Sequence, residues 1–330
     1  MKSFMKITII AALSLFYASG CATIKMNLFV DKTDPLEERT VQDGTSSSKI
    51  LLINIDGFIS NEEGFDFVRD TSSMVEDTVA QLRLAAQDSY VKAVLLKVNS
   101  PGGTATASDI IYHEIMSFKE KTGCKIYVHM MDIATSGGYM VSLPADKITA
   151  QPTSVTGSVG VIFLRPKLEG LCDKIGVSVY VSKSGENKDM GSPFRKETKE
   201  EEEIFQSLIN GLNSHFYSLV QKHRKITPDN LNRIRTARVF LAEEALKVGL
   251  IDGICYPDET IKLCIKDAGL RENSKVIAYR RKEYPDDNIY NTSKASASGN
   301  LSLINLGILN SIGNMKAGFY YVWPGALGEK

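Results

Sequence analysis

From Lys49 onward, apolar strand-like runs alternate with amphipathic helical segments, and this alternation constrains the fold more than any other feature of the chain. A chain built in this way forms βαβ units around a mainly parallel sheet. The strand-like runs are apolar throughout, which indicates that helices cover both faces of the sheet. We therefore expect an α/β fold. In chain order, the predicted elements are strands at 50–55, 91–98, 125–130 and 147–150, with helices at 74–87, 107–121 and 137–143.

The later part of the chain continues with weaker signals. Val177–Val181 has the pattern of a strand, Lys199–Arg224 that of a long amphipathic helix, and Ala242–Val248 that of a shorter one. Residues 281–300 are polar and are expected to form a loop or linker. Residues 301–323 are apolar but interrupted by glycine, which is consistent with a docked C-terminal element or an oligomer contact.

The N-terminus has the pattern of an export signal. Lys2 and Lys6 flank an uncharged apolar run, Ile7–Tyr17, which is too short to span a bilayer comfortably. Small residues then lead to Cys21 and resemble a bacterial lipobox, although Ala18 stands where leucine is usual. We expect a cleaved signal peptide and a lipid on Cys21. Simple secretion or an uncleaved anchor are the alternatives.

Composition excludes some classes of function. The 39 basic and 39 acidic side chains balance, so there is no electrostatic reason to expect a nucleic-acid partner. The five cysteines form no CxxC pair and no zinc-like cluster with histidine, so we expect no metal site. Their odd number argues against a complete disulfide framework and favours buried free thiols. A Cys255–Cys264 bridge stays open for an oxidising compartment.

Two glycine-rich segments follow predicted strands. Asn99–Gly103 would form a tight turn whose amides lie near a helix N-terminus, where they could bind a ligand; a plain connecting turn is the simpler alternative. Ser136 stands at the start of a predicted helix, directly before Gly137 and Gly138. A helix cap would explain the serine alone. The two glycines clear space around its hydroxyl, as expected for an exposed nucleophile.

A serine nucleophile needs a general base. Three of the four histidines lie on predicted helices, which leaves His129 as the serious histidine candidate, and Asp132 is too close in sequence to orient it convincingly. A lysine made neutral by burial is the alternative. Lys188 lies in a Gly- and Ser-rich segment, Ser184–Phe194, rather than on a charged helix face. Lys183 is a decoy that we expect along a strand edge.

Four motifs in this order resemble the protease IV or signal peptide peptidase A family: SPGG, ATSGGY, TGSVGV and SGENKDMGSPFR, at 100–103, 134–139, 156–161 and 184–195. Residues 237–240 and 249–252 are similar too, and 319–324 weakly so. Thr135 stands where the family more often has alanine, which is a conservative departure.

The resemblance implies a role for each matching residue. Ser136 matches the nucleophile, Lys188 the general base, and Ser158 a hydroxyl that orients the lysine amine. The backbone amides of Gly103 and Gly137 match the oxyanion hole. The implied reaction needs no cofactor and no metal, and the implied fold is the crotonase-like fold of the Clp protease subunit.

The resemblance also implies a cell-envelope setting and an assembly. A single-module member is expected to form a homo-oligomer, an octameric ring, in which Lys188 reaches Ser136 of the same or of a neighbouring subunit; the sequence leaves this open. The implied substrates are extended apolar peptides such as cleaved signal peptides, at a bacterial membrane facing the periplasm or exterior. The expected division is signal peptide 1–20, lipidated N-terminus and flexible tether 21–48, peptidase domain 49–280, and C-terminal linker and docking segment 281–330.

Two other functions compete with this interpretation. An acyl-CoA enzyme of the same fold would use the glycine-rich turn to stabilise an enolate and would need neither Ser136 nor Lys188. A lipoprotein scaffold that kept the fold without catalysis would not need Ser136, Lys188 and Ser158 together, yet all three are present.

Overall fold

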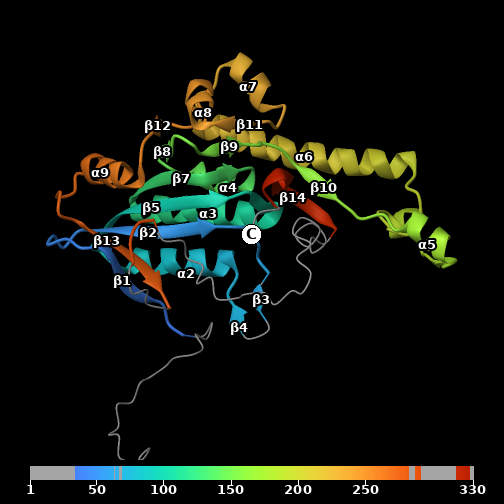
Figure 1. Cartoon of the computed structure of the whole chain (residues 1–330), viewed down its shortest axis with the longest axis horizontal. Coiled ribbons are helices and arrows are strands. Elements are labelled where there is room, and N and C mark those ends of the chain that lie inside the picture. Colours follow the sequence, from blue (N-terminus) through green and yellow to red (C-terminus); the bar gives the residue numbers. More distant parts are fainter. Residues whose placement is uncertain (1–33, 63, 67–68, 282–286, 291–316, 328–330) are drawn as a thin grey trace, which may run out of the picture.

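The computed structural model describes residues 34–62, 64–66, 69–281, 287–290 and 317–327. A nine-stranded sheet with the order β1-β13-β2-β5-β7-β8-β12 forms its centre, and β9 continues from β7 to β11 (Figure 1). Neighbouring strands from β13 to β12 are parallel, as is the β7–β9 pair, while β1–β13 and β9–β11 are antiparallel. The expected α/β fold with a mainly parallel sheet is confirmed.

The elements of this fold are as follows. The strands are β1 Glu37–Gln42, β2 Lys49–Asp56, β3 Gly64–Asp66, β4 Arg69–Thr71, β5 Val91–Ser100, β6 Gly102–Thr104, β7 Lys125–Thr135, β8 Lys147–Ala150, β9 Val155–Gly157, β10 Ile162–Leu164, β11 Val239–Leu241, β12 Gly253–Ile254, β13 Lys275–Arg280 and β14 Gly318–Val322. The helices are α2 Met74–Gln87, α3 Ala105–Thr122, α4 Gly137–Ser142, α5 Glu169–Ile175, α6 Lys199–His223, α7 Pro228–Ile234, α8 Ala242–Val248 and α9 Pro257–Asp267, with short 3-10 turns η1 Glu186–Asp189 and η2 Pro324–Ala326.

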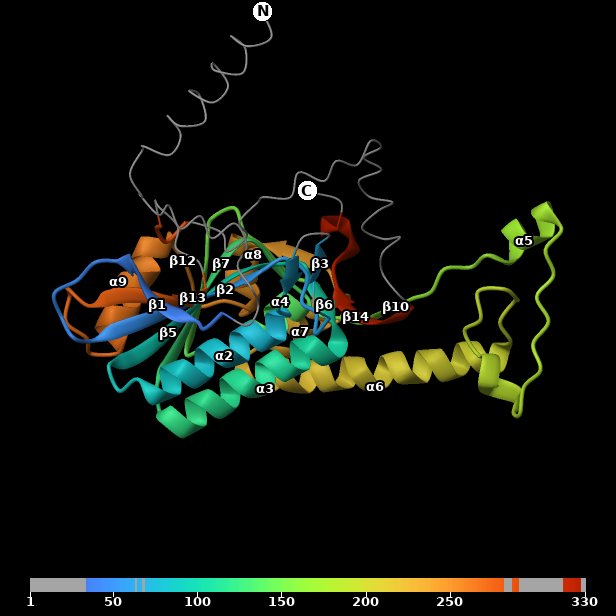
Figure 2. The ribbon, with the colours of Figure 1, turned by 90° about the horizontal axis from the view of Figure 1, so that it is seen from below.

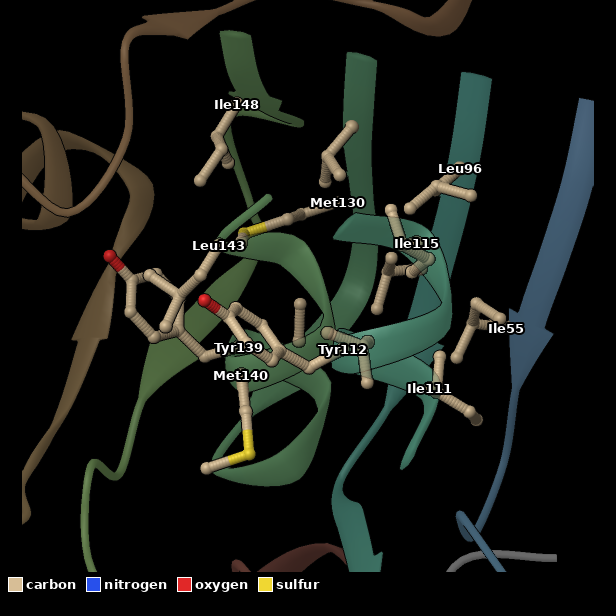
Figure 3. Packing of buried hydrophobic residues seen from close by; sticks show 14 of the residues in the cluster. Ile55, Leu96, Ile111, Tyr112, Ile115, Met130, Tyr139, Met140, Leu143 and Ile148 are labelled. Atoms are coloured by element: carbon tan, nitrogen blue, oxygen red, sulfur yellow. The ribbon is translucent and has the colours of Figure 1, made fainter. Parts of the chain in front are cut away.

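Helices cover both faces of the sheet, as the apolar strands predict. On one face, α2 and α3 lie side by side (Figure 2), and a large apolar cluster joins them to α4, α6 and α8. Figure 3 shows the part of this cluster between α3, α4 and the strands. On the other face, α9 packs through Ile261, Cys264 and Ile265 on residues of β2, β5 and β7. The sheet is thus buried between two layers, and its carboxyl-terminal edge carries the loops that form the site.

Two predictions from the sequence were wrong. Residues 21–48 were expected to be a lipidated N-terminus and flexible tether, but β1, within this range, pairs with β13 at the sheet edge and buries Val41. Val177–Val181 forms no strand, because the segment has no neighbouring strand to pair with and its side chains are exposed. Lys183 accordingly lies on no strand edge.

Residues 165–198, which we call the arm, connect β10 to α6. Figures 1 and 2 show α5 at the far end of α6, well away from the sheet. Large apolar side chains on the arm are exposed to solvent, including Leu171, Ile175, Val177, Tyr180 and Val181. Exposed apolar side chains of this kind are typical of a surface that contacts another protein or a membrane.

Of the apolar C-terminal segment 301–323, the structure describes residues 317–323. β14 docks between β6 and β10 in a three-stranded antiparallel sheet. Residues 1–33, which include Cys21, lie outside the described residues. Within the described ranges, no helix is both long enough and apolar enough to span a bilayer. Cys255 and Cys264 are free thiols, and Cys264 is the buried one.

Candidate active site

Ser136 stands at the junction of β7 and α4 in a strained backbone conformation. Its φ of 54° and ψ of −114° lie outside the regions that L-residues favour. Its amide donates to the Gly157 carbonyl at 2.8 Å, and its hydroxyl lies 3.5 Å from the Gly160 carbonyl. A serine on a sharp strand-to-helix turn is the geometry of a nucleophile elbow. Strain of this kind persists where the surroundings hold the residue for a function.

Ser158 lies beside this turn and also has a positive φ. It follows Gly157, the residue whose carbonyl binds the Ser136 amide, and its φ is 50°. Its own amide donates to the Arg238 carbonyl at 2.8 Å, which fixes the turn. In the described part of the chain, the non-glycine residues with positive φ are Ser136, Ser158 and Ala237. The structure therefore brings both predicted serine positions together.

The glycines after Ser136 are required by close packing. A Cβ at Gly137 would lie 2.3 Å from the Ser108 hydroxyl oxygen, and one at Gly138 would lie 2.7 Å from the Ser100 carbonyl oxygen. Any side chain at these positions would push α4 away from α3 and β5. The two glycines thus seat the helix that carries Ser136 at its N-terminus.

The predicted oxyanion turn lies directly against this helix. Gly102 has a φ of +100°, and a Cβ there would lie 2.8 Å from the Gly137 amide nitrogen and 2.0 Å from the Tyr321 carbonyl oxygen. Gly103 pairs with Tyr321 of β14 and bridges Ile59 on its other side. The edge of β6 next to Ser136 is therefore occupied by the chain's own β14.

Lys188 is not brought to Ser136 within one chain. It lies on η1 of the arm, is exposed, and its neighbour Asp189 is tied through Arg195 to Glu201 in the first turn of α6. The helix passes the site at Leu212, whose carbonyl accepts from the Tyr321 hydroxyl. At 1.5 Å per residue, these two points on α6 lie about 16 Å apart.

His129 is a core histidine. It is 1% exposed, and its Nδ1 contacts the hydroxyls of Thr260 at 2.8 Å and Thr149 at 3.1 Å. Burial, aided by the charge of Lys97, lowers the pKa of His129 to about 4. These contacts hold its ring toward α9.

Sequence reasoning missed a cavity of about 150 Å³ at the carboxyl ends of β2, β5 and β7, to which several polar and charged residues contribute. Lys97 lines it with 5% of its surface exposed, and burial together with the Arg280 charge lowers the pKa of Lys97 to about 8. Asn99 accepts from the Ile133 amide and donates to Asp56, both at 3.2 Å, which ties the segment before Ser136 to β2. A lysine inside the apolar run 91–98 was the available signal.

Two family models match the chain. Peptidase family S49 matches residues 119–271, which contain Ser136, Ser158 and Lys188, and Clp protease matches residues 66–155. The second match agrees with the observed α/β architecture. In the described residues, no group of three or more histidine, cysteine, aspartate or glutamate side chains is placed to hold a metal ion.

Relatives support the same assignment. A protein of Enterococcus faecium that carries the name of signal peptide peptidase SppA is 31% identical over 80% of this chain and 76% of its own length. A protease of Methanocaldococcus jannaschii is 37% identical over 60% of this chain, and protease 4 of Haemophilus influenzae 33% over 73%. The chain spans only 62% and 38% of the length of these last two. The chain therefore belongs to peptidase family S49, the family of signal peptide peptidase A and protease IV, and is a serine-type peptidase.

Proposed function

We propose that the protein is an endopeptidase with a Ser-Lys dyad, in which Ser136 is the nucleophile and Lys188 the general base. The observation that carries this proposal is the strained elbow at Ser136, with Gly137 behind it and the Gly102–Gly103 turn against it. Family membership leaves the acyl-CoA enzyme and the inert scaffold without support.

The proposed reaction proceeds through an acyl-enzyme. Neutral Lys188 accepts the Ser136 proton as the serine oxygen attacks the substrate carbonyl. The amides of Gly137 and Gly103 stabilise the tetrahedral oxyanion, and one such donor contributes about 3 kcal/mol. Lys188 then gives the proton to the leaving amine. In the second half of the reaction, Lys188 accepts a proton from the water that attacks the ester and returns it to the Ser136 oxygen. The Ser158 hydroxyl lies beside the lysine amine in this mechanism and orients it.

We infer that Lys188 acts on Ser136 of a neighbouring subunit. Two features support this. The turn that carries Lys188 is tied to the first turn of α6, whereas the site lies beside a later part of that helix. The arm that carries Lys188 also exposes apolar side chains that a second copy would cover. Burial in that contact would also desolvate the amine, which favours its neutral form. The octameric ring implied by the resemblance would bring each arm to the next subunit.

We infer that substrates are extended apolar peptides, such as cleaved signal peptides, that bind as an added strand. β14 supports this, since it already lies as a strand between β6 and β10 with its Tyr321 carbonyl next to the Gly137 amide. Ser136 has no exposed surface while β14 is in place. A peptide would therefore take the place of β14 at the edge of β6.

We propose that a lipid on Cys21 holds the protein on a bacterial membrane, with the peptidase domain from 49 to 280, joined by β1 and β14, facing the periplasm or exterior. Lipid chains bind membranes through burial of their methylene groups. Replacing Cys21→Ser should move the protein from the membrane fraction to the soluble fraction. Membrane retention of that variant would exclude the lipid as the anchor.

The variants Ser136→Ala and Lys188→Ala test the chemistry directly. Each should lose hydrolysis of an apolar peptide while its circular dichroism and its particle size by light scattering stay unchanged. Lys174→Ala, on α5 of the same arm, is the matched control and should keep full activity. Full activity of either the Ser136 or the Lys188 variant would refute the proposed dyad.

A further inference from the structure

The turn that carries Lys188 is held by an unusually complete set of charged contacts. Asp189 accepts from Arg195 through both carboxylate oxygens, from Nε and Nη2, each at 2.8 Å. The same guanidinium also binds Glu201, where Nη1 donates at 3.0 Å and Nη2 makes a second contact. We call Asp189, Arg195 and Glu201 the clasp. It joins the residue next to Lys188 to the first turn of α6.

The α6 end of the clasp is fixed. Glu201 is 1% exposed, and a buried carboxylate is tolerated only when it is paired. Besides Arg195, it accepts the backbone amide of Thr198 at 3.0 Å, and Thr198 in turn caps α6 through the Glu201 amide. Arg195 keeps the pKa of Glu201 below its usual value, so this anchor stays charged.

The arm end of the clasp is closed by a second cation. Lys183 donates to Asp189 at 2.9 Å and to the Glu186 carbonyl at 2.7 Å, across the 3-10 turn that contains Lys188. The Arg195 guanidinium, followed by Lys183, holds the pKa of Asp189 far below its usual range. Lys183, the decoy of the sequence analysis, thus belongs to the support of Lys188.

This arrangement contrasts with the rest of the arm. All residues from 176 to 188 are exposed, so apolar packing cannot fix the turn in the single chain. A general base has to be held within about 0.5 Å of its productive position. The guanidinium fork binds two carboxylates with defined geometry, which a lysine ammonium cannot reproduce.

We propose that Arg195 is a positioning residue for the peptidase reaction, which holds the Lys188 turn against the tip of α6 so that the amine enters the site in one orientation. This inference rests on the proposed function of Lys188. Arg195 itself touches neither the substrate nor the reacting atoms. Without it, Lys188 would sample positions outside the site, where water favours its charged form.

The test uses the full chain with Arg195→Gln and Arg195→Lys, and measures kcat, KM, the pH profile of kcat/KM and particle size. We expect Arg195→Gln to lower kcat about 100-fold, the cost of a misplacement of about 1 Å, with KM unchanged. The acid limb of the profile, which reports the base, should move to higher pH. Arg195→Lys should recover only a small part of kcat, because it restores the charge without the fork.

Arg233→Gln is the matched control, since it removes an exposed arginine–glutamate pair, with Glu244, outside the arm. It should leave kcat and the acid limb unchanged. A purely structural role of Arg195 would scale down kcat with the amount of assembled particle and leave the acid limb in place; that result, or unchanged kinetics, would overturn the inference. Full activity of Lys188→Ala would instead refute the proposed function itself.

Discussion

At the scale of single residues, the site depends on backbone positions that tolerate no side chain. Gly102 combines both kinds of constraint: its φ is +100°, and the Tyr321 carbonyl oxygen and the Gly137 amide nitrogen both lie within 3 Å of where a Cβ would stand. Gly123 also has a positive φ, of +68°, but no atom lies within 4 Å of its Cβ position. Comparing alanine variants of Gly102 and Gly123 therefore separates the cost of a positive φ, which both share, from the cost of a steric clash, which only Gly102 has.

Gly102→Ala should therefore abolish hydrolysis and lower the free energy of unfolding by clearly more than Gly123→Ala does. The Gly123 variant should lose about 1 kcal/mol, the cost of a left-handed conformation for alanine, and keep its activity. Urea denaturation and peptide hydrolysis measure both effects. Equal stability and activity of the two variants would contradict the close approach of β14 and α4 to Gly102.

His129 provides a prediction on pH. Its pKa is about 4 in the folded protein and 6.5 in the unfolded chain, so only the unfolded chain takes up this proton between those values. Stability should be complete above pH 6.5 and fall as the pH drops toward 4, by about 3 kcal/mol from this residue. Denaturation at pH 7 and 4.5 should show a smaller loss for His129→Gln than for the wild-type protein. An identical loss in both would show that another group controls the acid response.

The sequence predicted part of the geometry of this site. Ser136, Gly137 and Ser158 lie in recognisable motifs because their backbone geometry demands particular residues, and the structure brings them together. Lys97 and Asn99 were missed as supporting groups, because a single polar residue within or after an apolar strand gives no indication of what lies beside it in space. The hydrogen bonds of the Asn99 side chain with Asp56 and Ile133 form only once the strands are aligned.

At the scale of elements, local signals predicted boundaries well where they are strong. α2 begins and ends as predicted, since Ser73 and Glu76 form a capping box at its start. Val177–Val181 failed because a strand needs a partner, which the arm does not offer. β1 was missed because it is an edge strand with mostly polar, exposed residues, so only its pairing with β13 reveals it.

Truncation tests the contribution of β1. A chain of residues 34–330 retains every residue of β1 and is the reference. A chain of residues 43–330 should melt at a lower temperature, since it loses the pairing with β13, the burial of Val41 and the Glu38–Lys49 ion pair. Differential scanning calorimetry makes the comparison. Equal melting temperatures would show that β1 adds nothing to the sheet.

At the scale of the whole molecule, the described chain keeps the proposed nucleophile, Ser136, apart from the proposed base, Lys188. Ser136 lies in the packed body, and Lys188 lies on an arm that carries exposed apolar side chains. The motifs predicted both residues, but no local pattern shows whether two segments meet within one chain or between two. We therefore propose that the oligomer, rather than the subunit, is the active unit of the enzyme.

Mixing two inactive variants tests this account most directly. Ser136→Ala supplies only the lysine and Lys188→Ala only the serine, so a dyad formed between subunits can be rebuilt in a mixed oligomer. We predict that co-assembly of the two restores peptide hydrolysis, while each variant alone stays inactive. Mixed oligomers that form, as shown by two affinity tags, yet remain inactive would contradict a dyad shared between neighbouring subunits.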